Sequence, residues 1–341
     1  MKKGSITLEA PFELEAGGSV RNIHITYHSS EKEYDGKRKV VWICHALTAN
    51  SDPEDWWPQM VGPGKLIDTG KYFVVCVNML ASPYGSSGPA STDPATGRPY
   101  FFTFPALTIR DLISATVEVR RHLGISCVDL LIGSSIGGFQ ASEWAVTEPD
   151  VIRRLVLMAT DVRVSPWLTA SCEAQRMALE ADPTFRAAES LDGGKAGLKC
   201  ARAQALISYR SYEGYCTTQQ EADPDTLFAT RAASYERYQG EKLAKRFDAY
   251  SYYYLCNVLD SHNVGRHRGG VAAALCRISA ATTVIGIDSD GLFPPRQMRE
   301  WTSMIPGADF REITSAFGHD GFLLETEQLT KIVGPILESL G

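Results

Sequence analysis

The most constraining feature of this chain is a serine between two glycines, placed where a strand-length apolar run ends. Residues 128–132 are mostly apolar, and Gly133-x-Ser135-x-Gly137 follows directly, after which a helical pattern begins. A strand–turn–helix corner of this kind is so tight that side chains two residues from the serine would collide with the backbone, and glycine avoids the collision. The corner exposes the serine hydroxyl at a helix N-terminus, where amide dipoles favour negative charge. We therefore predict that Ser135 is a nucleophile, and the plainer alternative is a glycine-rich turn.

Length, composition and charge narrow the class of protein. A chain of 341 residues is long for one domain, but α/β folds of this size often carry an inserted cap instead of a second core. The hydrophobic content of 44% and the charged content of 22% are ordinary for a globular enzyme, and the net charge of −6 argues against nucleic acid or an anionic membrane as partner. We expect a cytoplasmic protein, because residues 1–9 lack the apolar core of a signal peptide and no apolar run could span a bilayer.

The eight cysteines are scattered and none forms a Cys-x-x-Cys pair. Several of them stand inside apolar strand patterns. We therefore expect reduced core cysteines, with no disulfide framework and no metal site.

Strand and helix patterns alternate in two parts of the chain. We expect strands at 20–27, 40–44, 72–77, 128–133, 155–158, 281–287 and 310–313. We expect helices at 109–123, directly after the serine corner, from Pro295 and from Thr326. Asp35-Gly36 is a hairpin turn signal. From 161 to about 270 strand signals nearly vanish and helical spacing dominates, with Tyr252-Tyr253-Tyr254 expected in a core. We therefore predict a core of 1–160 and 271–341, interrupted by a helical lid at 161–270.

The loop after the expected strand 40–44 is a second candidate element of the site. In the fold class that uses a glycine-flanked serine corner, this loop supplies a backbone amide to the reacting oxygen. Here the N–H of Leu47 would act with the N–H of Ile136, and two amides aimed at one oxygen lower the barrier by several kcal/mol. His45 stands at the end of the same strand, and we expect it to be a structural hydrogen-bonding residue.

An acid and a histidine follow the serine in the chain order of an α/β-hydrolase. Asp288 or Asp290 comes after the strand 281–287, and His319 comes after the strand 310–313. His319 would take the proton of Ser135, and the carboxylate would fix the ring tautomer and stabilise the imidazolium. Spacing alone does not choose between the two aspartates. The order predicts an α/β-hydrolase fold: a mostly parallel central sheet with helices on both faces and an inserted helical lid.

Several stretches of the chain, including those around the serine, the aspartates and the histidine, carry a resemblance to one known protein family. They are 45–48, 62–65, 84–89 (Tyr84-Gly85-Ser86-Ser87-Gly88-Pro89), 93–100, 108–111, the serine corner, 238–242, 246–252, 288–290 and 318–320. Through these stretches, which cover almost the whole chain, the sequence resembles the homoserine O-acetyltransferase family of α/β-hydrolase-fold acyltransferases. The resemblance implies that Asp290 is the acid of the triad. It also implies that Arg202, Tyr209 and Asp320 bind the amino-acid substrate; Arg202 and Tyr209 are two helical turns apart and can share one helix face.

The resemblance further implies a ping-pong reaction in methionine biosynthesis. Ser135 would take an acetyl group from acetyl-CoA as co-substrate, with no permanently bound cofactor, and pass it to the hydroxyl of L-homoserine. A homodimer through the lid is implied as well. Three alternatives stay open: a succinyl-CoA-dependent homoserine or serine O-acyltransferase, a serine hydrolase or esterase of the same fold, and a non-catalytic α/β-hydrolase scaffold that serves as a binding protein.

Overall fold

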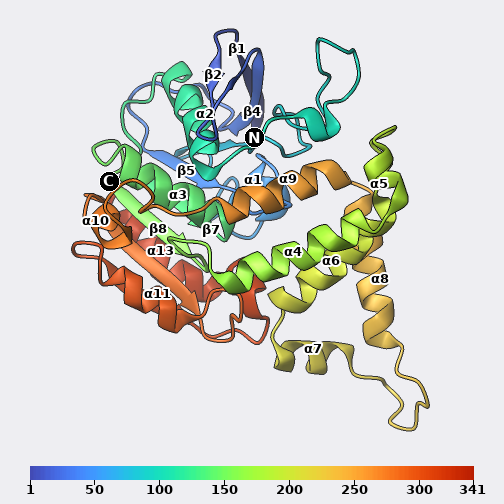
Figure 1. The fold of residues 1–341 in the computed structure, drawn as a ribbon. Helices are drawn as coiled ribbons and strands as arrows, with labels where there is room; N and C mark the ends of the chain where they lie inside the picture. The colour runs from blue at the N-terminus through green and yellow to red at the C-terminus, as the bar shows by residue number, and fades with distance from the viewer.

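An eight-stranded sheet runs through the middle of the molecule (Figure 1). The computed structural model describes residues 1–341. The strands lie in the order β1 (Lys2–Leu8), β4 (Ile23–Ser29), β6 (Phe73–Val77), β5 (Val40–Cys44), β7 (Leu130–Ser134), β8 (Arg154–Met158), β9 (Ala281–Ile287) and β10 (Asp309–Ile313). β4 pairs antiparallel with both β1 and β6, and every pair from β6 to β10 is parallel. The sheet is thus mostly parallel, as predicted, and a separate two-stranded sheet joins β2 (Phe12–Glu13) to β3 (Ser19–Val20).

Both faces of the sheet are buried, and alternate strand residues belong to two separate cores. Trp42 of β5 belongs to the larger core, whereas its neighbours Val41 and Ile43 belong to the smaller one. The larger core includes side chains of α2 (Ile109–His122), α3 (Ile136–Thr147), α10 (Val271–Leu275) and α11 (Pro295–Thr302). The smaller core includes side chains of α13 (Thr326–Glu338) and of the segment after α1 (Pro53–Trp56). Burial on both faces explains why the central strands are apolar without alternation.

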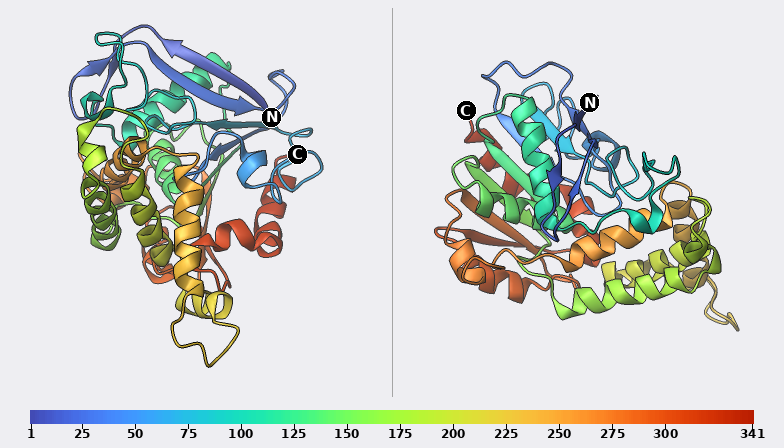
Figure 2. Two further views of the ribbon diagram at one scale, coloured as in Figure 1. Left: turned by 90° about the vertical axis from the view of Figure 1, so that its right-hand side faces the viewer. Right: turned by 45° about the horizontal axis from the view of Figure 1, so that its top comes forward.

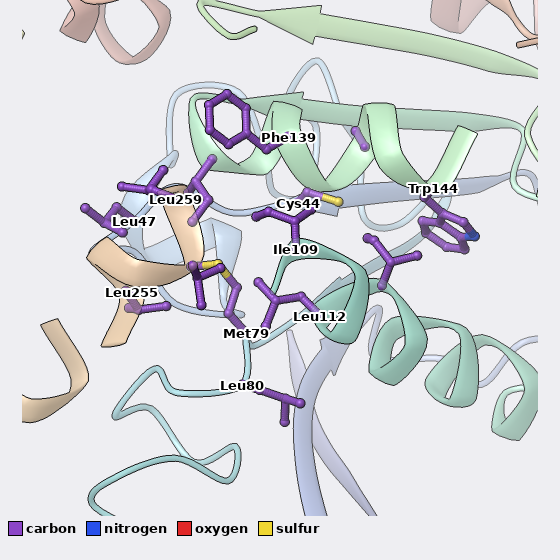
Figure 3. Packing of buried hydrophobic residues seen from close by; sticks show 14 of the residues in the cluster. Cys44, Leu47, Met79, Leu80, Ile109, Leu112, Phe139, Trp144, Leu255 and Leu259 are labelled. Carbon is purple, nitrogen blue, oxygen red and sulfur yellow. The ribbon is translucent and has the colours of Figure 1, made fainter. Parts of the chain in front are cut away.

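Six of the helices between β8 and β9 form a layer of their own beside the sheet (Figures 1 and 2). They are α4 (Pro166–Glu180), α5 (Pro183–Ala187), α6 (Lys195–Tyr209), α7 (Tyr212–Gln219), α8 (Arg231–Ala244) and α9 (Ala249–Asp260). α6 packs against both α4 and α8, and α9 packs against α4. α9 also contributes to the larger core, where its side chains meet those of α2 and α3 (Figure 3). The division of the chain at 161 and 270 stays a prediction.

The two ends of this helical insertion are hydrogen-bonded to each other. The amide of Val164 donates to the carbonyl of His262 at 2.9 Å, and the amide of Val264 donates to the carbonyl of Val162 at 3.1 Å. The insertion therefore leaves and rejoins the core through one paired stem.

Several expectations from the sequence are confirmed in detail. α2 begins at Ile109 behind Thr108, whose side chain accepts from the amide of Asp111, while the Asp111 carboxylate accepts from the amide of Thr108. This reciprocal arrangement is a capping box, and Gly124 follows the helix at a φ of 65°. The strands at 40–44 and 281–287 and the helices from Pro295 and Thr326 also have the predicted bounds. Tyr252 and Tyr254 are buried.

The strand expected at 20–27 is present as β4, although it runs from Ile23 to Ser29. Its antiparallel partner β1 was missed because Lys2–Leu8 is a half-exposed edge strand with polar residues. Two other expectations are wrong. Asp35-Gly36 forms no hairpin, because β4 and β5 are separated by β6. The cysteines are all free, but three of them are exposed on helices or at a helix end: Cys200, Cys216 and Cys276. No helix has both the length and the apolar character needed to cross a membrane.

Candidate active site

Ser135 occupies a strained corner between β7 and α3. Its φ is 56° and its ψ is −130°, which is a conformation that non-glycine residues rarely adopt. The flanking glycines are sterically required: a Cβ on Gly133 would collide with the carbonyl of Gly137, and a Cβ on Gly137 would collide with the carbonyl of Cys44. Thr160 steadies the corner, because its hydroxyl donates to the Ser135 carbonyl at 2.8 Å. The structure thus has the corner that the sequence predicts.

The structure brings Ser135, His319 and Asp290 into one line of hydrogen bonds. His319 Nε2 lies 2.9 Å from Ser135 Oγ, and His319 Nδ1 lies 2.8 Å from Asp290 Oδ2. The second carboxylate oxygen of Asp290 accepts from the amides of Leu292 at 2.8 Å and Phe293 at 3.0 Å. Asp290 and His319 are each 3% exposed. Every polar atom that the serine–histidine–aspartate chemistry needs is therefore already held in place.

The choice between the two aspartates, which spacing left open, is visible in the geometry. The carboxylate of Asp288 is exposed and accepts from the amide of Ser315 at 3.0 Å. It makes no hydrogen bond to His319. The turn after β9 therefore directs only Asp290 towards the imidazole.

The surroundings of His319 favour its charged form. Burial by itself would lower the pKa of His319, but the attraction and hydrogen bond of Asp290, together with the attraction of Asp320, raise that pKa above its ordinary value. Aromatic rings surround the imidazole, with ring centroids 5.2 Å away at Phe293, 5.4 Å at Phe322 and 5.6 Å at Tyr209. The imidazole is thus well suited to accept a proton and hold it.

The two backbone amides predicted to bind the reacting oxygen have no partner in the protein. Neither the N–H of Leu47 nor that of Ile136 donates a hydrogen bond, and Ile136 is the first residue of α3. Both amides are therefore free to donate to an oxygen at the corner.

His45 has the structural role that we expected. Its ring is fully buried, Nδ1 lies 2.9 Å from the carbonyl oxygen of Ala46, and Nε2 lies 3.1 Å from the amide nitrogen of Met79. Since that amide can only donate, Nε2 accepts and Nδ1 carries the proton. Burial lowers the pKa of His45 to about 4, so the ring is neutral near neutral pH. His45 thus fixes the loop that carries Leu47 instead of taking part in proton transfer.

A residue that the sequence reasoning missed holds the same loop from the lid side. Arg246 donates to the carbonyl of Thr48 at 2.5 Å and to the hydroxyl of Tyr84. Arg246 and Tyr84 both stand in stretches that carry the family resemblance, which is the signal that could have paired them.

The three predicted acceptor-binding residues lie near the triad. The Arg202 guanidinium is 5.8 Å from the ring centroid of Tyr209, whose ring is in turn close to His319. Asp320 follows His319 directly, and its Oδ2 lies 3.1 Å from Nη2 of Arg210. Sequence reasoning missed Arg210, although it is adjacent to Tyr209. It also missed Glu236 of α8, which faces both arginines and whose pKa is raised by burial although Arg202 and Arg210 both act to lower it.

No group of three or more histidine, cysteine, aspartate and glutamate side chains is arranged to hold a metal ion.

Sheet order, serine corner and inserted helices together define an α/β-hydrolase fold. Residues 39–326 match the family model for the alpha/beta hydrolase fold. The structure of esterase E22 superimposes with a TM-score of 0.89 at 23% identity, covering 98% of this chain and 99% of that one, a likeness that shows the fold alone.

Sequence comparison narrows the family. A homoserine O-acetyltransferase of Cyclobacterium marinum is 39% identical over 320 residues, which cover 94% of this chain and 91% of the relative. The crystal structure of a homoserine O-acetyltransferase from Staphylococcus aureus has a TM-score of 0.80 at 29% identity, and the match covers 98% of this chain and 95% of that one. This chain belongs to the homoserine O-acetyltransferase family.

Proposed function

We propose that this chain transfers the acetyl group of acetyl-CoA to the side-chain hydroxyl of L-homoserine, a step of methionine biosynthesis. The observation that carries the proposal is the continuous set of hydrogen bonds from Ser135 through His319 to Asp290 in a chain of this family. A non-catalytic scaffold would have no need of such a set at a strained corner.

In the first half-reaction Ser135 Oγ attacks the thioester carbonyl carbon while His319 Nε2 takes the hydroxyl proton. The carbonyl oxygen becomes negative and accepts from the amides of Leu47 and Ile136, at the N-terminus of α3. The C–S bond then breaks, His319 gives its proton to the departing sulfur, and free CoA and acetyl-Ser135 result. Asp290 keeps Nδ1 protonated throughout and stabilises the imidazolium.

In the second half-reaction the acceptor hydroxyl takes the place of the serine hydroxyl. His319 removes its proton, the oxygen attacks the acetyl carbon, and Ser135 Oγ leaves with the proton that His319 returns. We propose Arg202, Tyr209 and Asp320 as residues that hold the acceptor. The ring of Tyr209 lies beside the imidazole, the Arg202 guanidinium lies near the ring of Tyr209, and Asp320 follows His319 directly. A guanidinium is a good partner for a carboxylate.

Transfer to an alcohol instead of to water requires that water be kept from the acetyl-serine. We propose residues 161–270 as the lid that does this, with 1–160 and 271–341 as the catalytic core. The lid helices also expose large apolar side chains, among them Trp167 at 63%, Ile207 at 66%, Tyr212 at 79% and Tyr238 at 60%. Such a surface supports the proposal that two copies associate through the lid, and light scattering of the purified protein measures this directly. We expect the dimer to work in the cytoplasm.

The deciding experiment measures thiol release from acetyl-CoA with and without L-homoserine, together with the mass of the protein after mixing with acetyl-CoA alone. We expect an acetyl adduct on the peptide that contains Ser135, and thiol release that L-homoserine accelerates. Equal thiol release with and without the amino acid would identify a hydrolase instead. Adduct formation and turnover only with succinyl-CoA, or only with L-serine as acceptor, would replace the donor or the acceptor in the proposal.

A further inference from the structure

The loop that carries the Leu47 amide is anchored to the core at both of its ends. At its start, the buried ring of His45 donates from Nδ1 to the carbonyl of Ala46 at 2.9 Å. At its end, the carbonyl of Asn50 accepts from Nε1 of Trp56 at 2.9 Å. Side chains of the core therefore fix where the loop begins and where it ends, and they leave the tip between these two anchors free.

The tip of the loop is held from the lid instead. It is a turn, closed by a 3.0 Å hydrogen bond from the amide of Ala49 to the carbonyl of Ala46. Leu47 and Thr48 lie at the centre of this turn, where Nη1 of Arg246 donates to the Thr48 carbonyl at 2.5 Å. Arg246 is thus the side chain that fixes the centre of the turn.

The neighbours of Arg246 hold it in this position. Its Nη1 also donates to the hydroxyl of Tyr84, which belongs to the core segment between β6 and α2. The next residue, Phe247, is buried and packs edge-on against the ring of Tyr84, with 5.7 Å between the ring centroids. The amides of Arg246 and Phe247 both donate to the carbonyl of Leu243 near the end of α8. The guanidinium therefore joins the lid to the core at a defined point.

Two peptide groups connect Arg246 with the Leu47 amide. The Thr48 carbonyl, which accepts from Arg246, belongs to the same planar peptide group as the Ala49 amide. The Ala49 amide donates to the Ala46 carbonyl, which in turn shares a peptide group with the Leu47 amide. Because the N–H of a trans peptide points away from its C=O, a fixed Ala46 carbonyl aims the Leu47 N–H. Hydrogen bonds in series also polarise one another, so the positive charge of Arg246 makes this N–H a better donor.

We propose that Arg246 is a positioning residue for the oxyanion hole, which is the pair of backbone amides of Leu47 and Ile136. From the lid it holds the turn so that the Leu47 amide points at the oxygen that becomes negative. Displacement of the lid would release the turn and leave the triad intact. Ser135 therefore reacts fast with an acyl donor only while the lid covers the site and keeps water out. This inference rests on the proposed function and adds a link between the lid and the chemistry.

The first test compares the rates at which Ser135 is acylated. The wild-type protein and Arg246→Met are mixed with para-nitrophenyl acetate, and the initial burst of nitrophenolate is followed. Loss of a complete donor from an oxyanion hole slows a reaction about 10²- to 10³-fold, so a donor that stays but loses its aim should slow it about 10- to 100-fold. Arg246→Lys keeps the charge and should recover part of the rate. Tyr84→Phe leaves the bond to Thr48 in place and should slow acylation only about threefold.

A second measurement separates positioning from the binding of the donor. The ketone trifluoroacetonyl-CoA adds the hydroxyl of Ser135: the oxygen–carbon bond forms, His319 takes the proton, and the ketone oxygen becomes negative in the oxyanion hole. Free CoA cannot form this oxygen. We expect Arg246→Met to weaken binding of the ketone about 10- to 100-fold and to change the affinity for CoA less than about threefold.

The matched control is Lys245→Met, which removes a positive charge from the exposed position one residue earlier. It should behave as wild type in both measurements, and thermal unfolding checks that every variant is folded. Arg246→Lys allows the same comparison, with a smaller expected effect, if Arg246→Met does not fold. The proposal is overturned if acylation of Arg246→Met stays within about twofold of wild type. It is also overturned if this variant loses affinity for CoA as strongly as for the ketone, because Arg246 would then bind the donor.

The proposed function can fail separately. If the wild-type protein transfers no acetyl group from acetyl-CoA to L-homoserine, the proposed function is wrong, and the rates with para-nitrophenyl acetate still decide the role of Arg246. Normal transfer to L-homoserine, with unchanged acylation in Arg246→Met, would retain the proposed function and overturn the inference. A wild-type protein in which neither compound acylates Ser135 would overturn both.

Discussion

The serine corner and the charged side chains Arg202 and Glu236 of the lid differ in how far their hydrogen bonds are completed. At the corner His319 and Asp290 use all the polar atoms that the chemistry requires, with contacts of 2.8–3.0 Å. Under the lid Nε of Arg202 and both carboxylate oxygens of Glu236 have no hydrogen-bond partner. The core therefore holds its reactive groups ready before any substrate arrives, whereas the lid keeps charged groups without hydrogen-bond partners at a cost in stability.

The largest expected effect comes from removal of the nucleophile. Ser135→Ala should lower acetyl transfer about 10⁴-fold or more, because no acetyl-enzyme can form. Thiol release and the mass of the protein after exposure to acetyl-CoA are the measurements. Acetyl transfer at the wild-type rate, with no adduct in either protein, would mean that the two substrates react directly.

Replacement of the acid should have the next largest effect. Asp290→Asn should reduce kcat about 10³- to 10⁴-fold, because the amide no longer holds the imidazole in the tautomer that accepts the serine proton. Asp288→Asn is the matched control two residues away, and its exposed side chain is not bonded to His319, so kcat should stay within about twofold of wild type. The reverse order of the two effects would contradict the assignment of Asp290.

On the lid side, Arg202→Met should raise the KM for L-homoserine about 30-fold through loss of the carboxylate partner. The KM of Arg202→Lys should lie between those of wild type and Arg202→Met, since lysine keeps the positive charge but loses the forked geometry of the guanidinium. Arg237→Met, at an exposed position of α8, serves as control. A KM unaffected by Arg202→Met would place the acceptor elsewhere.

The pH dependence of thiol release links the two regions through Asp320. His319 must be neutral to take the serine proton, so the rate should fall as pH drops through the raised pKa of His319. Asp320→Asn removes one of the charges that raise this pKa, and the acidic limb of kcat/KM should move to lower pH. A limb that moves to higher pH, or does not move, would show that Asp320 does not act on the charge of His319.

The smallest expected effect concerns stability. Glu236→Leu removes a carboxylate whose buried oxygens have no hydrogen-bond partner, and should raise the free energy of unfolding by about 1 kcal/mol. Denaturant unfolding of both proteins without substrate measures the difference. A clear loss of stability would show that Glu236 already has a structural partner in the free protein.

What the sequence could predict at the site depends on how local each feature is. The Ser135 corner is encoded within five residues, and the order of acid and histidine follows from the fold class. Asp288 and Asp290 follow the same strand, so only the backbone of the turn, which lets Oδ1 of Asp290 accept two amides, shows which one meets His319. Glu236 is invisible in the sequence because its position depends on how α8 packs against α6, across a long connection.

How local a feature is in the sequence also decides which strands and helices could be predicted. Buried parallel strands such as β5 and β9 have continuous apolar runs that predict their bounds. The edge strand β1 begins with Lys2-Lys3-Gly4-Ser5 and has no such signal, since edge strands are protected by charge. Cys200 and Cys216 were expected in a core together with the other cysteines, but they lie at exposed positions of α6 and α7, which the residue type alone does not reveal.

The paired stem at 162–164 and 262–264 has a consequence for how this family can diversify. Because the insertion begins and ends on two segments that are hydrogen-bonded to each other, its interior can be rebuilt without disturbing the strands that present the serine, the acid and the base. New acceptor preferences can therefore evolve by exchange or drift of the segment between the two halves of the stem, provided that the side chains of α9 that pack in the larger core are kept. A laboratory chimera joined at this stem is a direct way to alter which alcohol is acylated.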